Sequence, residues 1–109
     1  MNIDVIDKKS YCLIRIKDDL LDETDMKPLK TEAQAQLDNG MINIAISFTR
    51  NSHIHSLTIA VLIQILGFVK EFGGKLAVVH PNAKILEILE VVGLEKLVAT
   101  STSEDSITL

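Results

Sequence analysis

The sequence predicts a small α/β domain in which a mixed sheet is covered chiefly by helices. The chain has 109 residues, which is room for one hydrophobic core and not for two. Strand-like apolar runs alternate with helical segments of about 10 to 15 residues, a pattern typical of right-handed β-α-β crossovers. Hydrophobic residues make up 47% of the chain, with no Trp, one Tyr and three Phe, so the core is aliphatic. We therefore expect residues 1–109 to form a single domain.

The N-terminal part of the chain predicts a β-hairpin and then a helix. Apolar and polar residues alternate in Ile3–Val5 and in Tyr11–Ile16, on either side of a turn-like stretch, which favours two short paired strands. From Thr24 to Leu37 the apolar residues fall on one helical stripe, and Asn39-Gly40 then provides a stop signal. The members of this stripe are Met26, Leu29, Ala33 and Leu37.

The middle of the chain predicts two buried strands on either side of a helix. Met41–Ile46 is a nearly continuous apolar run, typical of a strand that is buried on both faces, and Lys75–Val79 is a second such run. Between them we expect a helix over Leu57–Phe72, with Ser56 as its N-cap and Gly73-Gly74 as its end.

The C-terminal part predicts a third helix, over Ala83–Val92, which Gly93 ends. Residues Leu94–Ala99 are expected to lead back to the sheet, and the polar tail Thr100–Leu109 to hold a short terminal helix. The side chains of the third helix that we expect to face inward are Ile85, Leu86, Ile88 and Leu89.

The predicted topology gathers polar residues at one edge of the sheet. If the strands at Tyr11–Ile16, Met41–Ile46 and Lys75–Val79 are parallel, the loops that follow them share the edge where α/β domains place their binding sites. The residues expected at this edge are Asp18, Asp19, the loop Ser47–Ser56 and His80.

Composition argues against several classes of partner. The formal net charge is -4 and the pI is about 5.2, so the chain lacks the basic excess of nucleic-acid-binding proteins. The longest apolar stretch, Ile59–Val69, is interrupted by Gln64 and is far shorter than the ~20 residues that cross a bilayer. The first residues resemble no signal peptide, and the single Cys12 excludes an internal disulfide, so we expect a cytoplasmic protein.

No pattern in the sequence predicts catalysis or a cofactor. There is no constellation of nucleophile, base and acid, and Gly73-Gly74 precedes a strand instead of opening a phosphate-binding helix. His53 and His55 are one residue apart and His80 follows a neighbouring strand, so three imidazoles could bind zinc with an aspartate. The alternative is three solvent-facing loop histidines. We expect no enzyme and no cofactor, assign no metal ligand, and leave the zinc hypothesis open.

Three segments carry a resemblance to a known family. They are IHSLTIAVL at Ile54–Leu62, the turn EFGGKL at Glu71–Leu76, and Leu86–Leu97 with its Gly93-Leu94 exit. Together with the order of elements, they resemble a STAS domain of the anti-sigma factor antagonist family, whose members commonly read IDSSGLGVL, GGxLxLVxP and LxxxGLxxLF. The resemblance covers nearly the whole chain. It implies a mixed sheet of four to five strands packed with three to four helices.

The resemblance also implies a function and a site. It places Ser56 at the family's phosphorylatable serine, with His55 in place of Asp, Leu57 in place of a second Ser, and Thr58 in place of Gly. In phosphorylation-controlled members, the unmodified serine permits binding to an anti-sigma factor kinase and phosphoserine blocks it. The implied partner-binding loop and helix start contain His53, His55, Ser56, Leu57 and Thr58.

Two alternatives stay open at this point. Ser56 is either a phosphoacceptor or only a cap whose hydroxyl accepts a backbone N–H. Because His55 and Thr58 depart from the family motif, the chain resembles a divergent member, and the rival function is a non-phosphorylated subunit of a transporter or signalling assembly. The sequence leaves the oligomeric state open.

Overall fold

The computed structural model describes residues 1–91, 93–94 and 96–109. It contains a five-stranded sheet with the strand order β1-β2-β3-β4-β5, in which only β1 is antiparallel to its neighbour. The strands are β1 Ile3–Asp7, β2 Cys12–Ile16, β3 Ile44–Ser47, β4 Leu76–Val79 and β5 Ala99–Ser101. The helices are α1 Lys27–Asp38, α2 Ser56–Glu71 and α3 Ala83–Val91, and a 3-10 turn follows at Glu104–Ser106. The predicted mixed α/β fold is confirmed.

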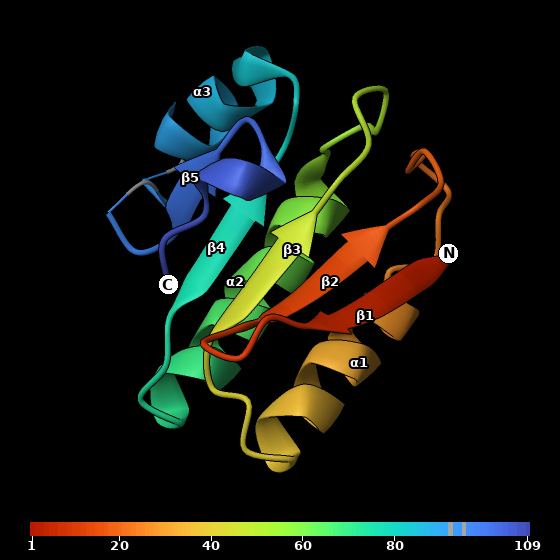
Figure 1. Ribbon diagram of the computed structural model, residues 1–109. Coiled ribbons are helices and arrows are strands. Elements are labelled where there is room, and N and C mark those ends of the chain that lie inside the picture. The colour runs from red at the N-terminus through yellow and green to blue at the C-terminus, as the bar shows by residue number, and fades with distance from the viewer. Residues whose placement is uncertain (92, 95) are drawn as a thin grey trace.

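The helices and the C-terminal segment cover opposite faces of the sheet (Figure 1). Helices α1 and α2 lie side by side on one face, over the main core of Ile, Leu and Val side chains. On the other face a small cluster of Leu13, Ala45 and Ala77 is buried, and Ile107 and Leu109 pack against it. The segment after β5 therefore closes a face that no α-helix of the described chain covers.

The predicted hairpin and helix ends are found with small shifts. β1 and β2 pair in antiparallel register, and Gly40 and Gly73, predicted to end α1 and α2, have φ angles of 93° and 76°. Helix α1 begins at Lys27 and not at Thr24. Pro28 occupies its first turn, and Met26 stands at the N-cap position without a side-chain capping hydrogen bond. The buried members of α1 are Leu29, Ala33 and Leu37, as the stripe predicts.

Strand β3 is shorter than predicted, because Asn43 is used to join neighbouring segments. Its carbonyl accepts the N–H of Cys12 (2.9 Å), and its side-chain oxygen accepts the N–H of Lys75 (3.0 Å). Its side-chain nitrogen donates to the carbonyl of Ser10 (3.2 Å). The ladder of β3 therefore begins only at Ile44.

The prediction for α3 is partly wrong. Leu89 is buried and Leu86 packs against the core, but Ile88 is 41% exposed. Ile88 is two positions, about 200° of helical rotation, from Leu86 and so faces away. The side chain of Ile85 and residue 92 are outside the described part of the structure. The return to the sheet is found, since Leu94 and Val98 are buried and β5 starts at Ala99.

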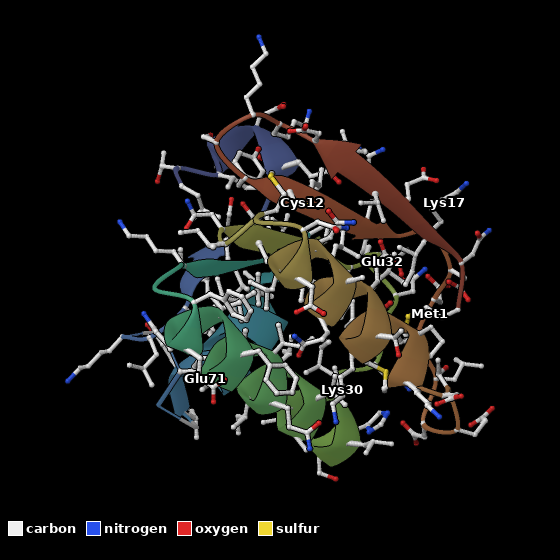
Figure 2. The ribbon with its side chains drawn as sticks, turned by 90° about the horizontal axis from the view of Figure 1, so that it is seen from below. Met1, Cys12, Lys17, Lys30, Glu32 and Glu71 are labelled. Carbon is white, nitrogen blue, oxygen red and sulfur yellow. The ribbon has the colours of Figure 1, made fainter. Side chains whose placement is uncertain are left out.

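Cys12 lies at the start of β2, on the face that α1 covers (Figure 2). It is 1% exposed, and burial, with smaller contributions from Glu32 and Asp7, raises the pKa of its thiol to about 11. A thiol that stays protonated at neutral pH is a packing group and not a nucleophile.

No helix in the described residues is long and apolar enough to cross a membrane.

Candidate functional site

The loops that follow β2, β3 and β4 lie at one edge of the sheet, which we call the carboxyl edge (Figure 1). The three strands are parallel, so residues 17–26, 48–55 and 80–82 leave the sheet in the same direction. This confirms the predicted topology. It also brings the polar residues of three loops within reach of one another.

Two of these loops are joined by hydrogen bonds. The N–H of Leu20 donates to the hydroxyl oxygen of Ser52 (2.9 Å), and the carbonyl of Leu20 accepts the N–H of His53 (2.8 Å). Ser52 is 3% exposed and Leu20 is fully buried, so the junction is shielded from water. The loop that leads to Ser56 is therefore fixed from its inner side.

The two aspartates predicted at this edge, Asp18 and Asp19, lie in different places. Asp19 accepts a hydrogen bond from the hydroxyl of Thr49 (2.6 Å) and thus lies beside the β3–α2 loop. Asp18 turns to the N-terminus, where its carboxylate accepts the backbone N–H of Asn2 (2.8 Å). Only Asp19 belongs to the candidate site.

His55, and not Ser56, caps helix α2. His55 has extended backbone angles, its Nδ1 accepts the N–H of Leu57 (3.3 Å), and its Nε2 lies 3.3 Å from the carbonyl of Leu21. Ser56 is the first residue of the helix and its side chain is exposed. The prediction that Ser56 is the N-cap is wrong, because the cap precedes the first helical residue and an imidazole nitrogen fills it.

The predicted partner-binding residues divide between surface and core. His53 and Ser56 are exposed, Leu57 is 50% exposed, and His55 is partly buried by its capping role. Thr58 is fully buried and its hydroxyl has no partner in the described structure, so its side chain is not part of the surface. Four of the five predicted side chains thus reach the surface.

The structure does not gather the three histidines. His53 is exposed, with its Nδ1 3.5 Å from the carboxylate of Asp22, whereas His80 is fully buried. In the described ranges no three His, Cys, Asp or Glu side chains come close enough to hold a metal ion. The reading of His80 as a solvent-facing residue is also wrong.

His80 is a buried base beneath the β3–α2 loop. Its ring stacks on Phe48 (centroids 6.0 Å apart), and its Nδ1 accepts the N–H of Asn82 (3.0 Å). Burial lowers the pKa of this imidazole; the backbone of Ser52 opposes the shift and the charge of Arg50 adds to it. Nε2 has no hydrogen-bond partner of good geometry in the described structure. His80 is therefore neutral at physiological pH.

The outer face of α2 is uncharged and mostly apolar, which the sequence pattern did not reveal. The segment Ser56–Val69 contains no charged residue, although one side of the helix faces water. A helix that is apolar all round is normally buried on all sides. The exposed residues on this side after Ser56 are Leu57, Ala60, Ile63, Gln64 and Gly67, of which only Gln64 is polar. The missing charge in an exposed helix was the signal that could have identified this face.

A hollow of about 490 Å³ lies at the carboxyl edge and reaches His55, the residue before Ser56. It is lined by Asp22, Arg50, Asn51, Ser52, His53, Ile54, His55 and Asn82. Its ionisable groups are one carboxylate, one guanidinium and two imidazoles, so charges of both signs line it.

Comparison with known proteins gives a consistent answer. The STAS domain family model matches residues 2–107, while no curated protein sequence matches the chain significantly. The crystal structure of TM1081, a candidate anti-sigma factor antagonist from Thermotoga maritima, has a TM-score of 0.75 at 19% identity, covering 95% of this chain and 87% of that one. The NMR structure of TM1081 has a TM-score of 0.69 at 21% identity, covering 90% and 77%.

A third structure is the Bacillus cell fate determinant SpoIIAA in its phosphorylated form. It has a TM-score of 0.71 at 15% identity and covers 96% of both chains. At these identities the structures show a shared fold, and the family match spans nearly the whole sequence. The chain belongs to the STAS domain family.

Proposed function

We propose that this protein binds a regulatory partner, an anti-sigma factor kinase or a related protein, through the β3–α2 loop and the start of α2. It acts by binding and not by catalysis, and phosphorylation of Ser56 ends the interaction. The observation that carries the proposal is the exposed hydroxyl of Ser56 beside an exposed apolar helix face that begins at Leu57. The unpaired, buried Cys12 fits the reducing cytoplasm as the place of action.

The position of Ser56 suits a phosphate switch. A phosphoserine carries about -1.5 to -2 charges at neutral pH, and the first turn of a helix tolerates such an anion. The fold is therefore kept after modification. At the same time a hydrated dianion beside Leu57 opposes the burial of that side chain against a partner. One modification thus weakens binding without unfolding the domain.

The departures from the family motif are compatible with this function. His55 stands where family members commonly have Asp, a good N-cap, and its Nδ1 still accepts the N–H of Leu57. Thr58 stands in place of Gly, but its side chain points into the core and adds no bulk to the surface. The start of α2 therefore presents Ser56 as the family motif would.

A second function is a permanent contact within a transporter or signalling assembly, in which Ser56 is never modified. It is favoured by the length of the apolar face, which continues to Gly67, eleven residues beyond Ser56. At 1.5 Å per residue this is about 16 Å of helix, farther than a phosphate on Ser56 reaches. Such a partner would bind the face irrespective of the state of Ser56.

Binding measurements separate the two functions. The partner to test first is a histidine-kinase-like ATPase encoded beside this protein, with calorimetry on the wild type, Ser56→Ala and Ser56→Asp. We expect Ser56→Ala to bind like the wild type and Ser56→Asp to bind at least about tenfold more weakly. Ser10→Asp is the matched control, because Ser10 is exposed in the β1–β2 turn, away from α2.

Phosphate analysis completes the test. Incubation with the ATPase and ATP, followed by mass spectrometry, should place the phosphate on Ser56. If Ser56→Asp binds as tightly as the wild type and Ser56 stays unmodified, the phosphorylation switch is excluded. If Ile63→Asp then abolishes binding of a partner isolated with the protein, the permanent contact is supported.

A further inference from the structure

His80 lies beneath the β3–α2 loop, residues 48–55, and is completely shielded from water. Its ring stacks on Phe48, the first residue of the loop, with the centroids 6.0 Å apart. The backbone of Ser52, in the middle of the loop, also faces the imidazole. The loop is therefore packed against a side chain that takes up a proton at about pH 6.5 when water surrounds it.

A hydrogen bond to Nδ1 fixes the protonation state of this imidazole. Nδ1 accepts the N–H of Asn82 at 3.0 Å, within the turn that joins β4 to α3. An accepting nitrogen carries no proton, so the proton of the neutral ring is on Nε2. A second proton must enter at Nδ1, where it faces the N–H of Asn82 and breaks the hydrogen bond. Protonation therefore disturbs the β4–α3 turn as well as the loop above it.

The closed loop opposes a positive charge on His80. Burial is the largest effect that lowers the pKa of the imidazole; the backbone of Ser52 partly offsets it, and the charge of Arg50 adds to it. Arg50 is the charged side chain that acts on His80 within the described structure. The other ionisable side chains around the hollow that adjoins the loop are Asp22, His53 and His55. When the loop moves away, water solvates the imidazolium and the penalty of burial is lost.

The loop is held closed by a few polar contacts. The hydroxyl of Ser52 accepts the N–H of Leu20, and the N–H of His53 donates to the carbonyl of Leu20. Between Phe48 and α2, Ser52 is the one residue that is buried, so little apolar surface fastens this segment. Segments with few buried apolar contacts open at a lower cost in free energy than the whole fold. The opening that hydrates His80 is therefore local.

We infer that the β3–α2 loop is a pH-sensitive switch, in which protonation of His80 breaks the bond with Asn82 and releases the loop from Leu20. The sheet and the helices stay folded, because the side chains of their core lie outside residues 49–53. In the released state the residues before Ser56 have no fixed position, so a partner that recognises the closed loop binds more weakly in acid. The switch lies in the loop itself and operates whether or not Ser56 is phosphorylated.

Amide hydrogen exchange of the full chain, measured by NMR at pH 7.5 and 5.5, tests the switch. The amides that report on the closed loop are those of Leu20, His53 and Asn82. If His80 ionises with a pKa of about 6.5 in the open state and stays neutral in the closed state, the open population rises about tenfold over this range. After correction for intrinsic exchange rates, the protection of these three amides should therefore fall about tenfold.

Low concentrations of urea separate this opening from global unfolding. Local opening exposes little surface, so exchange of the three loop amides at pH 5.5 should be almost insensitive to urea. The amides of Cys12 and Ile44, which are bonded at the opposite edge of the sheet, should be protected more strongly and should exchange faster as urea increases. Loop amides that respond to urea in the same way as Cys12 and Ile44 would overturn the inference.

Variants of the three histidines identify the group responsible. His80→Asn keeps an acceptor for the N–H of Asn82 but cannot titrate, so the protection of its loop amides should not fall. His53→Gln combined with His55→Asn leaves His80 as the only imidazole and keeps a good N-cap residue, so the tenfold fall should remain. This double variant decides the matter if His80→Asn does not fold. Loss of the fall in the double variant, or an equal fall in His80→Asn, would contradict the switch.

Discussion

Arg15 and Glu104 are 89 residues apart in the sequence, yet two parallel N–H···O bonds join them at 2.9 and 2.6 Å. Arg15 lies in the second strand of the sheet and Glu104 in the last turn of the described chain. The pair thus fastens the segment that covers Leu13, Ala45 and Ala77. A polar contact at one end of this segment and two apolar contacts at the other hold the second face of the sheet closed.

The Arg15–Glu104 pair is expected to make a measurable contribution to stability. Hydrogen bonds to charged groups contribute about 1.5 to 3 kcal/mol, and partial exposure of both side chains reduces this to about 1 kcal/mol for Arg15→Gln. Urea unfolding at neutral pH measures the difference. Lys17→Gln breaks the weaker pair with Asp4 and should cost less than about 0.5 kcal/mol. Equal losses in the two variants would contradict this prediction.

The same pair predicts a pH dependence in the acid range. Hydrogen bonding to Arg15 lowers the pKa of Glu104 in the folded state below its ordinary 4.5. The folded state then binds fewer protons than the unfolded one, so the contribution is fully present above pH 4.5 and is lost as the pH falls through the lowered pKa. The stability difference between wild type and Glu104→Gln should therefore shrink on acidification from pH 5. A constant difference would show that the pair does not titrate.

His55 and Ser56, at the start of α2, are expected to differ in their contribution to the stability of the domain. His55→Ala removes the acceptor for the N–H of Leu57 and should cost about 1 kcal/mol of unfolding free energy. Ser56→Ala removes a hydroxyl that caps nothing in the described structure and should change stability by less than about 0.5 kcal/mol. Thermal melting compares the two. A larger loss for Ser56→Ala would restore Ser56 as the cap.

Alanine substitutions at Gly74 and Gly67 are expected to have opposite effects on stability. A Cβ at Gly74 would overlap the backbone carbonyl of Ile42, so Gly74→Ala should cost at least about 2 kcal/mol or prevent folding. Gly67, in the middle of α2, has open space around its α-carbon, and Gly67→Ala should stabilise the protein by up to about 1 kcal/mol. Soluble yield and urea midpoints distinguish the two outcomes. Similar behaviour of both variants would argue against the close approach at Gly74.

Much of the fold could be predicted from periodicity, because the pattern reflects local burial. The alternation around Tyr11–Ile16 and the apolar run at Met41–Ile46 correspond to strands β2 and β3, and the alternation of strands with helices predicted the mixed sheet. The ends of elements were predicted less well where side chains compete with the ladder, as Asn43 does before β3. Ile88 shows that an apolar residue in a helix need not face the core.

The candidate site was predicted less completely than the fold. Parallel strands fixed which loops share the carboxyl edge. Helical spacing also places Thr58 on the same side of α2 as the buried Leu62 and Ile65, but no local rule reveals that His80 is buried. Its burial depends on the β3–α2 loop, whose Phe48 stacks on the imidazole. The contact between Arg15 and Glu104 is also invisible in sequence, since it joins the second strand to the C-terminal segment.

Burial of His80 predicts a loss of stability near pH 6. Desolvation lowers the pKa of the folded imidazole below its ordinary 6.5, so the unfolded chain takes up a proton that the folded chain refuses. Stability from this residue is full above pH 6.5 and falls as the pH decreases toward the lowered pKa. Between pH 7.5 and 5.5 the unfolding free energy should drop by on the order of 1 kcal/mol on account of His80.

His80→Asn isolates this effect, because an amide oxygen can replace Nδ1 as the acceptor for the N–H of Asn82 while carrying no titrating group. The variant is expected to be less stable at every pH, since it leaves space beside Phe48, but its unfolding free energy should vary less between pH 7.5 and 5.5. All other ionisable groups are the same in the two proteins, so the comparison isolates His80. If wild type and His80→Asn lose stability in parallel, the buried imidazole is not the source of the pH dependence.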